Sequence, residues 1–172
     1  MAETSQQETL RLRLWGPLSA LGLVIAALSF GIDQAFKWWM LHVFDIAARQ
    51  PITLLPVFDI VLAWNRGISY GWLSEGSWTS QGVLIALAVI ISAGLWVWLA
   101  KASRPVTAAA IGLILGGAIA NAFDRAAYGA VADFFSFHVG SFEWYIFNLA
   151  DVAIVAGVAL LVYESLTEGR AR

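Results

Sequence analysis

The sequence contains no cysteine among its 172 residues. This absence excludes disulfides, thiolate nucleophiles and cysteine-ligated metal centres. Charge is also scarce: charged side chains make up 13% of the chain, whereas a soluble domain carries about a quarter. The formal net charge of -2 provides no basic surface, so we expect no nucleic-acid partner. Hydrophobic residues make up 60% of the chain instead, a composition typical of an integral membrane protein.

The few charges separate long uncharged runs. Three runs, at residues 14–32, 76–100 and 105–123, approach or exceed the roughly 20 residues that a helix needs to cross a bilayer. A fourth run, 152–163, is too short to cross unless its span begins earlier and places Asp151 inside the membrane. We therefore predict an all-α polytopic membrane protein with four transmembrane helices, forming a single membrane domain over the whole chain. The expected spans are about 14–35, 79–100, 105–124 and 145–164, joined by outward connections at 38–80 and 125–145.

Basic residues predict how the chain is oriented in the membrane. They are more frequent on the side that holds both termini and the turn after the second span, although the connections on the other side are much longer. The first set is Arg11, Arg13, Lys101, Arg104, Arg170 and Arg172, and the second is Lys37, Arg49, Arg66 and Arg125. The positive-inside rule therefore places both termini in the cytoplasm. We interpret the first apolar run as a span, because it is long for a signal peptide and lacks a small-residue cleavage site.

The outward connections have strand-like patterns. The first contains β-prone residues at 57–64 and is expected to be extended. In the second, Gly140-Ser141 provides a turn with glycine first, and 142–147 returns. Before the turn, one set of side chains alternates with another along the segment: Val131, Asp133, Phe135, Phe137 and Val139 with Ala132, Phe134, Ser136 and His138. These patterns predict a small extracytoplasmic β element.

The hairpin register brings two acids together. If Gly140-Ser141 is the turn, Phe135 faces Ile146 and Asp133 faces Asn148. Asp151 lies three residues beyond Asn148, on the same face of the fourth helix. Asp133 is then returned to the mouth of the fourth span, close to Asp151. A slip of one residue would point Asp133 away from this place.

Two carboxylates in a poorly solvated place cannot both ionise readily, so the pair holds one proton near neutral pH. Such a dyad can activate water with its ionised member and protonate a scissile carbonyl with the other. The sequence has neither an HExxH zinc motif nor a Gly-x-Ser-x-Gly elbow. A serine–lysine dyad that uses Lys37 remains an open alternative.

Simpler structural roles also fit these residues. Asn148 and Asp151 have the spacing of a helix N-cap with an acidic third residue. Asp33 and Lys37, four residues apart, form a plausible i, i+4 pair with a structural role. Arg125, at the outward end of the third span, suits the helix dipole. The two histidines, His42 and His138, are interpreted as interfacial or surface residues.

Five sequence blocks resemble one family. In order, the blocks are Asp33-Gln-Ala-Phe-Lys37, Asn65-Arg-Gly-Ile-Ser-Tyr-Gly71, Gly116-Gly-Ala-Ile-Ala-Asn-Ala-Phe-Asp-Arg125, Val131-Ala-Asp-Phe134 and Phe147-Asn-Leu-Ala-Asp151. Each block alone is weak evidence, but all five occur in order and at matching places relative to the four spans. With them, the chain resembles lipoprotein signal peptidase (signal peptidase II) over nearly its whole length.

The resemblance implies an intramembrane aspartic endopeptidase of the bacterial cytoplasmic (inner) membrane. Its substrate would be a prolipoprotein, cleaved just before a cysteine that carries diacylglycerol, at the outer face of the membrane. The resemblance assigns the catalytic roles to Asp133 and Asp151 and makes Asp124 a structural acid. It also names residues that shape or support the pocket: Asp33, Lys37, Asn65, Gly67, Asn121, Arg125, Asn148 and Ala150. We expect no cofactor and no metal, contact with membrane lipid, and a monomer.

Two other classes of function stay open at this point. In a small ion-coupled transporter, Asp133 and Asp151 would bind the cation. Against that reading, the chain has only four spans and no inverted repeat. A purely structural membrane scaffold is the other alternative, and it predicts that Asp151→Asn is tolerated.

Overall fold

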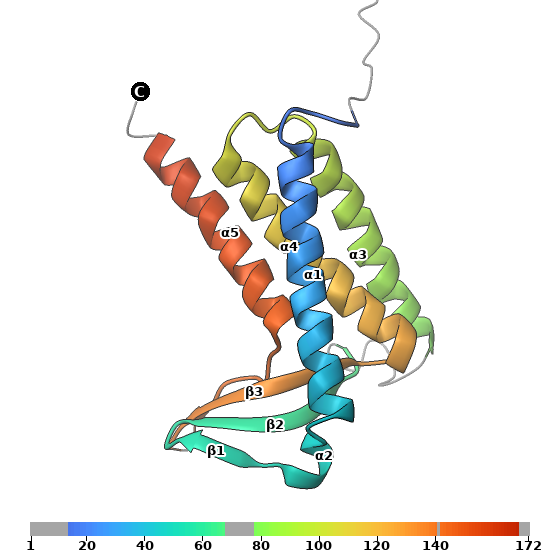
Figure 1. Cartoon of the computed structure of the whole chain (residues 1–172), viewed down its shortest axis with the longest axis vertical. Helices are drawn as coiled ribbons and strands as arrows, with labels where there is room; N and C mark the ends of the chain where they lie inside the picture. The colour runs from blue at the N-terminus through green and yellow to red at the C-terminus, as the bar shows by residue number, and fades with distance from the viewer. Residues whose placement is uncertain (1–13, 68–77, 141, 169–172) are drawn as a thin grey trace, which may run out of the picture.

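The computed structural model describes residues 14–67, 78–140 and 142–168. Four of its helices are long and apolar enough to cross a membrane, and a small sheet lies at one end of the bundle that they form (Figure 1). The elements in chain order are α1 (Ser19–His42), α2 (Ile46–Arg49), β1 (Ile52–Leu55), β2 (Phe58–Asn65), α3 (Trp78–Leu99), α4 (Pro105–Tyr128), β3 (Val131–Val139), β4 (Phe142–Glu143) and α5 (Leu149–Glu168). The predicted fold class is confirmed.

The ends of the long helices differ from the expected ends. Helix α1 begins at Ser19 and continues to His42, well past residue 35, because Lys37 pairs with Asp33 inside the helix and is not left alone in an apolar setting. Helix α4 extends to Tyr128, and Gly129 follows it in the left-handed conformation that often ends a helix. Helix α5 begins at Leu149, later than the expected residue 145, so the second outward connection is shifted along the chain from the expected 125–145 to 129–148.

Helix α4 is the centre of the bundle. It packs against α1, α3 and α5. In the most apolar stretch of α4, 56% of the residues are buried, compared with 22% or less in the corresponding stretches of the other three candidate spans. Close approach requires small residues: a Cβ atom at Gly117 would collide with the backbone carbonyl oxygen of Ala150 in α5. The contact between α4 and α5 is therefore formed backbone to backbone, directly beside Asp151.

The sheet has the order β1-β2-β3-β4 with antiparallel pairs. The predicted hairpin register is confirmed near the turn, where Val139 pairs with Phe142; Ser141 lies outside the described residues. Farther from the turn, Phe135 pairs with Phe147, so the predicted pairing of Phe135 with Ile146 is wrong. The returning chain has one extra residue there, in the manner of a β-bulge. Most of β3 pairs instead with β2, the segment that was expected to be extended.

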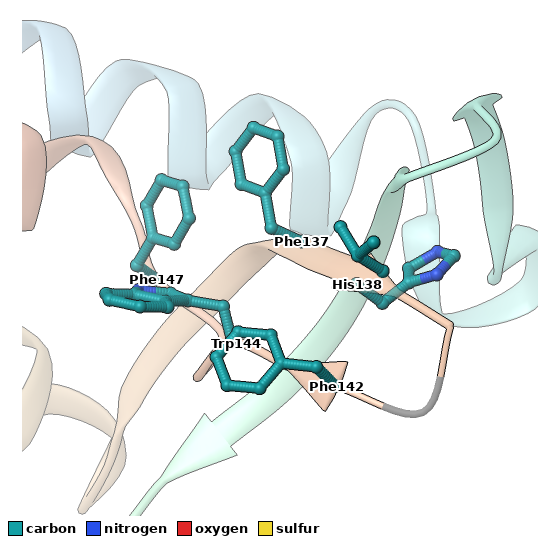
Figure 2. A pocket seen from close by; sticks show the side chains of 6 residues that line it. Phe137, His138, Phe142, Trp144 and Phe147 are labelled. Atoms are coloured by element: carbon teal, nitrogen blue, oxygen red, sulfur yellow. The ribbon is translucent and has the colours of Figure 1, made fainter.

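Aromatic residues gather at the outer end of the hairpin. They line a hollow of about 350 Å³ between the end of β3 and the returning chain. Figure 2 shows Phe137, Phe142, Trp144 and Phe147 around it, with His138 at its far side. Trp144 and Phe147 also border the candidate active site.

Candidate active site

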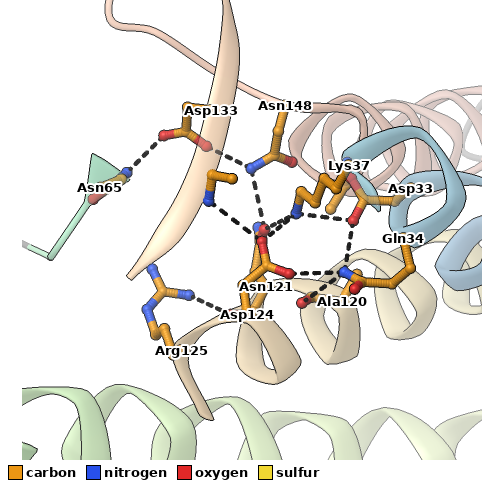
Figure 3. A network of polar contacts seen from close by, with 12 residues as sticks. Asp33, Gln34, Lys37, Asn65, Ala120, Asn121, Asp124, Arg125, Asp133 and Asn148 are labelled. Atoms are coloured by element: carbon orange, nitrogen blue, oxygen red, sulfur yellow. Dashed lines mark hydrogen bonds and ion pairs between the residues drawn. The ribbon is translucent and has the colours of Figure 1, made fainter. Parts of the chain in front are cut away.

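Asp133 is the third residue of β3 and is almost completely buried, with 2% of its surface exposed. Two amide side chains hold its carboxylate (Figure 3). Asn65, at the end of β2, donates from Nδ2 to Oδ2 at 3.1 Å. Asn148, just before α5, donates from Nδ2 to Oδ1 at 2.6 Å. Although the ladder slips by one residue, the predicted proximity of Asp133 and Asn148 is therefore observed.

Asp151 is in the first turn of α5 and is partly exposed. Its backbone N–H donates to Oδ1 of Asn148 at 3.0 Å, and the backbone N–H of Asn148 donates to Oδ2 of Asp151 at 3.2 Å. This reciprocal pair is a capping box, so the simple N-cap reading of these residues is correct. The cap is not the whole role, however, because Oδ1 of Asp151 also accepts a hydrogen bond of 2.8 Å from Nδ2 of Asn121 in α4.

Two amides connect the two aspartates. Nδ2 of Asn148 donates both to Asp133 and, at 3.1 Å, to Oδ1 of Asn121. Asn121 in turn donates to Asp151. Asp133 and Asp151 therefore belong to one hydrogen-bond network, and each keeps a defined orientation without a direct hydrogen bond between them.

Burial governs the protonation of Asp133. The pKa of its carboxyl group is raised from 3.8 to about 6; loss of solvent is the largest cause, and the nearby charge of Asp151 acts in the same direction. The hydrogen bonds from Asn148 and Asn65 act in the opposite direction, because they stabilise the ionised form. A carboxyl group that titrates close to neutral pH suits a residue that gives and takes a proton.

A buried lysine pairs with two further acids that hold the backbone next to both aspartates. Nζ of Lys37 lies 2.9 Å from Oδ2 of Asp33 and 2.6 Å from Oδ2 of Asp124. Asp33 accepts a hydrogen bond of 2.9 Å from the backbone N–H of Ala150, and Asp124 accepts one of 3.4 Å from that of Ala132. Each acid thus holds the backbone amide that immediately precedes one of the two site aspartates.

The open alternative of a serine–lysine dyad does not fit this arrangement. Besides its two acids, Lys37 contacts Oδ1 of Asn121 at 3.4 Å, and it is 2% exposed. None of its hydrogen bonds or ion pairs within the described chain involves a serine. Its ammonium group is occupied by two carboxylates and an amide oxygen, so no described serine is placed against it as a nucleophile.

Gln34 belongs to the network, although sequence reasoning missed it. Its Nε2 donates to Oδ1 of Asp124 at 2.8 Å and to Oδ2 of Asp33 at 3.1 Å. The only signal was its position directly after Asp33, in the first of the five blocks. Whether that position faces α4 depends on the rotation of α1, which the sequence alone does not give.

Three further predicted residues border the same site. Gly67 donates its backbone N–H to Oδ1 of Asn65 at 3.1 Å, and its φ of +116° is a conformation that L side chains rarely adopt. Arg125 donates from Nη1 to the backbone oxygen of Asn121 at 3.1 Å, and its buried Nε has no hydrogen-bond partner in the described part of the chain. Ala150 is fully buried against α4.

The histidines lie outside the site, as expected. His42 is exposed at the end of α1. His138 is farther out on β3, where its Nε2 lies 3.0 Å from Oδ2 of Asp59. Across the described ranges, no group of three or more His, Asp or Glu side chains is arranged to hold a metal ion.

A groove leads from Asp151 along the flank of α5. Its volume is about 380 Å³, and Asp151 supplies the only charged side chain among the described residues that line it. Those residues are Trp144, Tyr145, Phe147, Asp151, Val152, Val155, Ala156 and Ala159. The groove shares Trp144 and Phe147 with the aromatic hollow of Figure 2. The polar network around Asp151 thus opens sideways into an apolar channel along α5, a helix that is long and apolar enough to cross a membrane.

Comparison with known proteins identifies the family. The family model for signal peptidase (SPase) II matches residues 25–167. The chain belongs to the signal peptidase II family. The resemblance predicted from the sequence is thereby confirmed, and the chain is a membrane aspartic peptidase by family.

Relatives match over most of their length. The lipoprotein signal peptidase of Methylocella silvestris is 52% identical over 87% of this chain and 88% of the relative. That of Beijerinckia indica is 50% identical over 88% of this chain and 90% of the relative. A solved structure described as a bacterial membrane enzyme has 25% identity and a TM-score of 0.73, covering 89% of this chain and 92% of that one.

Proposed function

We propose that this protein removes signal peptides from bacterial prolipoproteins whose cysteine carries diacylglycerol, with Asp133 and Asp151 as the catalytic dyad. Relatives named lipoprotein signal peptidase, at about half identity over most of the chain, support the activity. The observation that carries the assignment of the dyad is the amide bridge through Asn148 and Asn121, which joins the two carboxylates.

The environments of the two acids suggest a different catalytic role for each of them. Asp133 is buried, so its protonated form is favoured and substrate that excludes more water will favour it further. Asp151 is partly exposed at the groove. Its carboxylate accepts hydrogen bonds from Asn121 and Asn148 and, with about four acceptor positions in all, it can still hold a water.

In the first step, ionised Asp151 takes a proton from this water while the water oxygen bonds to the scissile carbonyl carbon. Asp133 donates its proton to the carbonyl oxygen, which gives a neutral gem-diol. In the second step the carbon–nitrogen bond breaks: Asp151 gives its proton to the leaving amine, and a diol hydroxyl returns a proton to Asp133. Both acids end in their starting protonation states.

The groove along α5 supports a lipid-modified substrate. Its apolar walls, which include Val152 and Val155, run from Asp151 along a helix that is long and apolar enough to span the membrane. An acyl chain can occupy such a channel without leaving an apolar environment, while the amide next to the modified cysteine reaches the polar end. Each acyl methylene that leaves water for the membrane contributes about 0.8 kcal/mol, so the lipid keeps the substrate in the membrane beside the dyad, an anchor that a bare peptide lacks.

The orientation in the membrane is part of the proposal. Basic residues at the end of the bundle opposite the sheet favour cytoplasmic termini. The sheet and the dyad then lie at the outer face of the cytoplasmic membrane. We also propose that the protein acts as a monomer, because Asn121 and Asn148 join the two carboxylates without a residue of a second copy.

The test uses purified enzyme in detergent and a synthetic precursor whose cysteine carries diacylglycerol, with cleavage followed by mass spectrometry. We expect Asp133→Asn and Asp151→Asn each to lower the rate at least about 100-fold, since each removes one proton-transfer group. The matched control is Asp45→Asn, at an exposed residue with positive φ, a conformation that asparagine tolerates well; it should cleave at the wild-type rate. The same precursor without the lipid should be cleaved poorly.

Other outcomes would identify other functions. Cleavage by both aspartate variants at the wild-type rate would remove the dyad assignment. An ion gradient dissipated by proteoliposomes, with no cleavage by wild-type enzyme, would indicate a transporter.

A further inference from the structure

A polar pocket lies at the end of the bundle remote from the two aspartates. It is formed between the turn that joins α3 to α4 and the last turns of α5. Figure 1 shows this turn at the end of the bundle opposite the sheet. The pocket has a volume of about 400 Å³, within the roughly 300–1,000 Å³ that is common for small-ligand sites.

The charges that line the pocket are only partly balanced. Glu164 accepts a hydrogen bond of 2.6 Å from Oγ1 of Thr107 and lies 3.2 Å from Nη1 of Arg104. It therefore holds Arg104 at the pocket wall and offsets one positive charge. Lys101 also lines the pocket, and no acidic side chain of the described residues forms an ion pair with it. Among the described residues that line the pocket, Lys101 and Arg104 are basic and Glu164 is acidic, which leaves one positive charge.

The ends of the candidate spans indicate that the pocket lies near the membrane interface. The candidate span of α3 ends at Leu99, that of α4 begins at Pro105, and that of α5 ends at Thr167. Trp98 is half-exposed at the pocket rim, and tryptophan rings favour the membrane interface. The hydroxyl groups of Ser103 and Ser165 add two hydrogen-bond donors.

We propose that this pocket binds the phosphodiester headgroup of one anionic membrane lipid. The ligand has to reside at the interface, carry one negative charge and offer acceptor oxygens, and an anionic phospholipid meets all three conditions. Basic pockets between transmembrane helices are known sites for lipid headgroups. A zwitterionic lipid has the same phosphodiester, but its own cation competes with Lys101. The bound lipid would tie the α3–α4 turn to α5 without touching the dyad.

The test measures lipid retention by native mass spectrometry of the full chain in detergent. Dioleoylphosphatidylglycerol and dioleoylphosphatidylcholine are titrated separately, and we expect tighter retention of one phosphatidylglycerol molecule. Lys101→Gln should weaken that binding about fivefold, because one basic side chain near the membrane surface contributes about 1 kcal/mol. Lys101→Arg should preserve it. The matched control is Arg49→Gln, which removes an exposed positive charge in α2 beside the sheet and should change nothing.

Three outcomes would overturn the proposal. Equal retention of the two lipids would mean that the basic residues act only as determinants of membrane orientation. Equal loss with Arg49→Gln and Lys101→Gln would indicate a general effect of net charge. Full competition by inorganic phosphate at the same concentration as the lipid would indicate a site for soluble anions. Cleavage of the synthetic precursor in micelles should be unaffected by Lys101→Gln, so a failure here is separate from a failure of the peptidase assignment.

Discussion

At the scale of single residues, the most informative feature is the unequal setting of the two aspartates. Asp133 is enclosed on β3 with amide donors on both carboxylate oxygens, whereas Asp151 is partly open to a groove. The same residue type thus acquires two chemical characters from its surroundings. Asn148 contributes to both settings, because one side chain caps α5 through its oxygen and binds Asp133 through its nitrogen.

The elevated pKa of Asp133 predicts the pH dependence of cleavage. With the pKa at about 6 in the free enzyme, the protonated form is lost as pH rises through that value. If Asp133 is the proton donor, kcat/KM should fall about tenfold per pH unit above this point. Initial rates with the lipidated precursor between pH 4.5 and 8.5 measure this decrease in kcat/KM at high pH.

Asn65→Ala is the corresponding control for the pH dependence. It removes a hydrogen bond that stabilises ionised Asp133, so the pKa of Asp133 should rise. The decrease in kcat/KM should then begin at a higher pH, whatever happens to the maximum rate. If the decrease in kcat/KM begins at the same pH as in wild type, or at a lower pH, the titrating group is not Asp133.

At the scale of secondary-structure elements, α4 decides how the site is assembled. It contributes Asn121 and Asp124, and its small residues let α1 and α5 approach closely. Gly117 meets the backbone oxygen of Ala150, the residue before Asp151. The distance between α4 and α5 is thus set one residue away from the candidate catalytic group.

Gly117→Ala should therefore reduce both stability and activity. The added methyl group has no room and forces α4 and α5 apart, at a cost of about 1–3 kcal/mol for an overpacked contact. Asp151 would move away from Asn121, so kcat should fall more than substrate binding weakens. Thermal unfolding in detergent, followed by circular dichroism, and steady-state kinetics test the two effects.

Gly94→Ala is the matched control in α3. Nothing lies within 4 Å of a Cβ atom placed at Gly94, and alanine is favoured over glycine in a helix interior by about 1 kcal/mol. This variant should be as stable as wild type or more stable, with normal kinetics. Equal damage from both substitutions would refute the packing argument.

At the scale of the whole molecule, Lys37 connects parts that are distant in sequence. It lies in α1, pairs with Asp124 of α4, and through Asp33 and Asp124 fixes the backbone at the start of α5 and β3. A bundle and a sheet that could shift relative to each other are thereby joined around one buried charge. This is a positioning role, because within the described chain Lys37 makes no hydrogen bond or ion pair with Asp133 or Asp151.

Lys37→Met should be strongly destabilising. Breaking a buried ion pair by removing one partner typically costs 3–5 kcal/mol, because the remaining charges are left uncompensated. The triple variant Asp33→Asn, Lys37→Met and Asp124→Asn has no unpaired charge and keeps an acceptor for Ala150 and for Ala132. Unfolding in detergent should show the triple variant to be more stable than Lys37→Met alone. A triple variant less stable than the single one would show that the charges are not the cause.

Several properties of this protein follow from the sequence by itself. The four spans are set by the length and polarity of local runs, and the capping box of Asn148 and Asp151 by a spacing of three residues. The turn of the hairpin likewise follows from neighbouring residues. These features depend on interactions within a few residues of one another, so a linear pattern contains the necessary information.

The tertiary structure decided the rest. The pairing of β3 with β2, the slip that matches Phe135 with Phe147, the entry of Gln34 into the network and the burial of Lys37 between two acids all join distant segments. Each depends on how helices rotate and how closely they pack. Those quantities are fixed only when α1, α4 and α5 meet and bury their small residues together, because no single segment determines which of its faces will be covered.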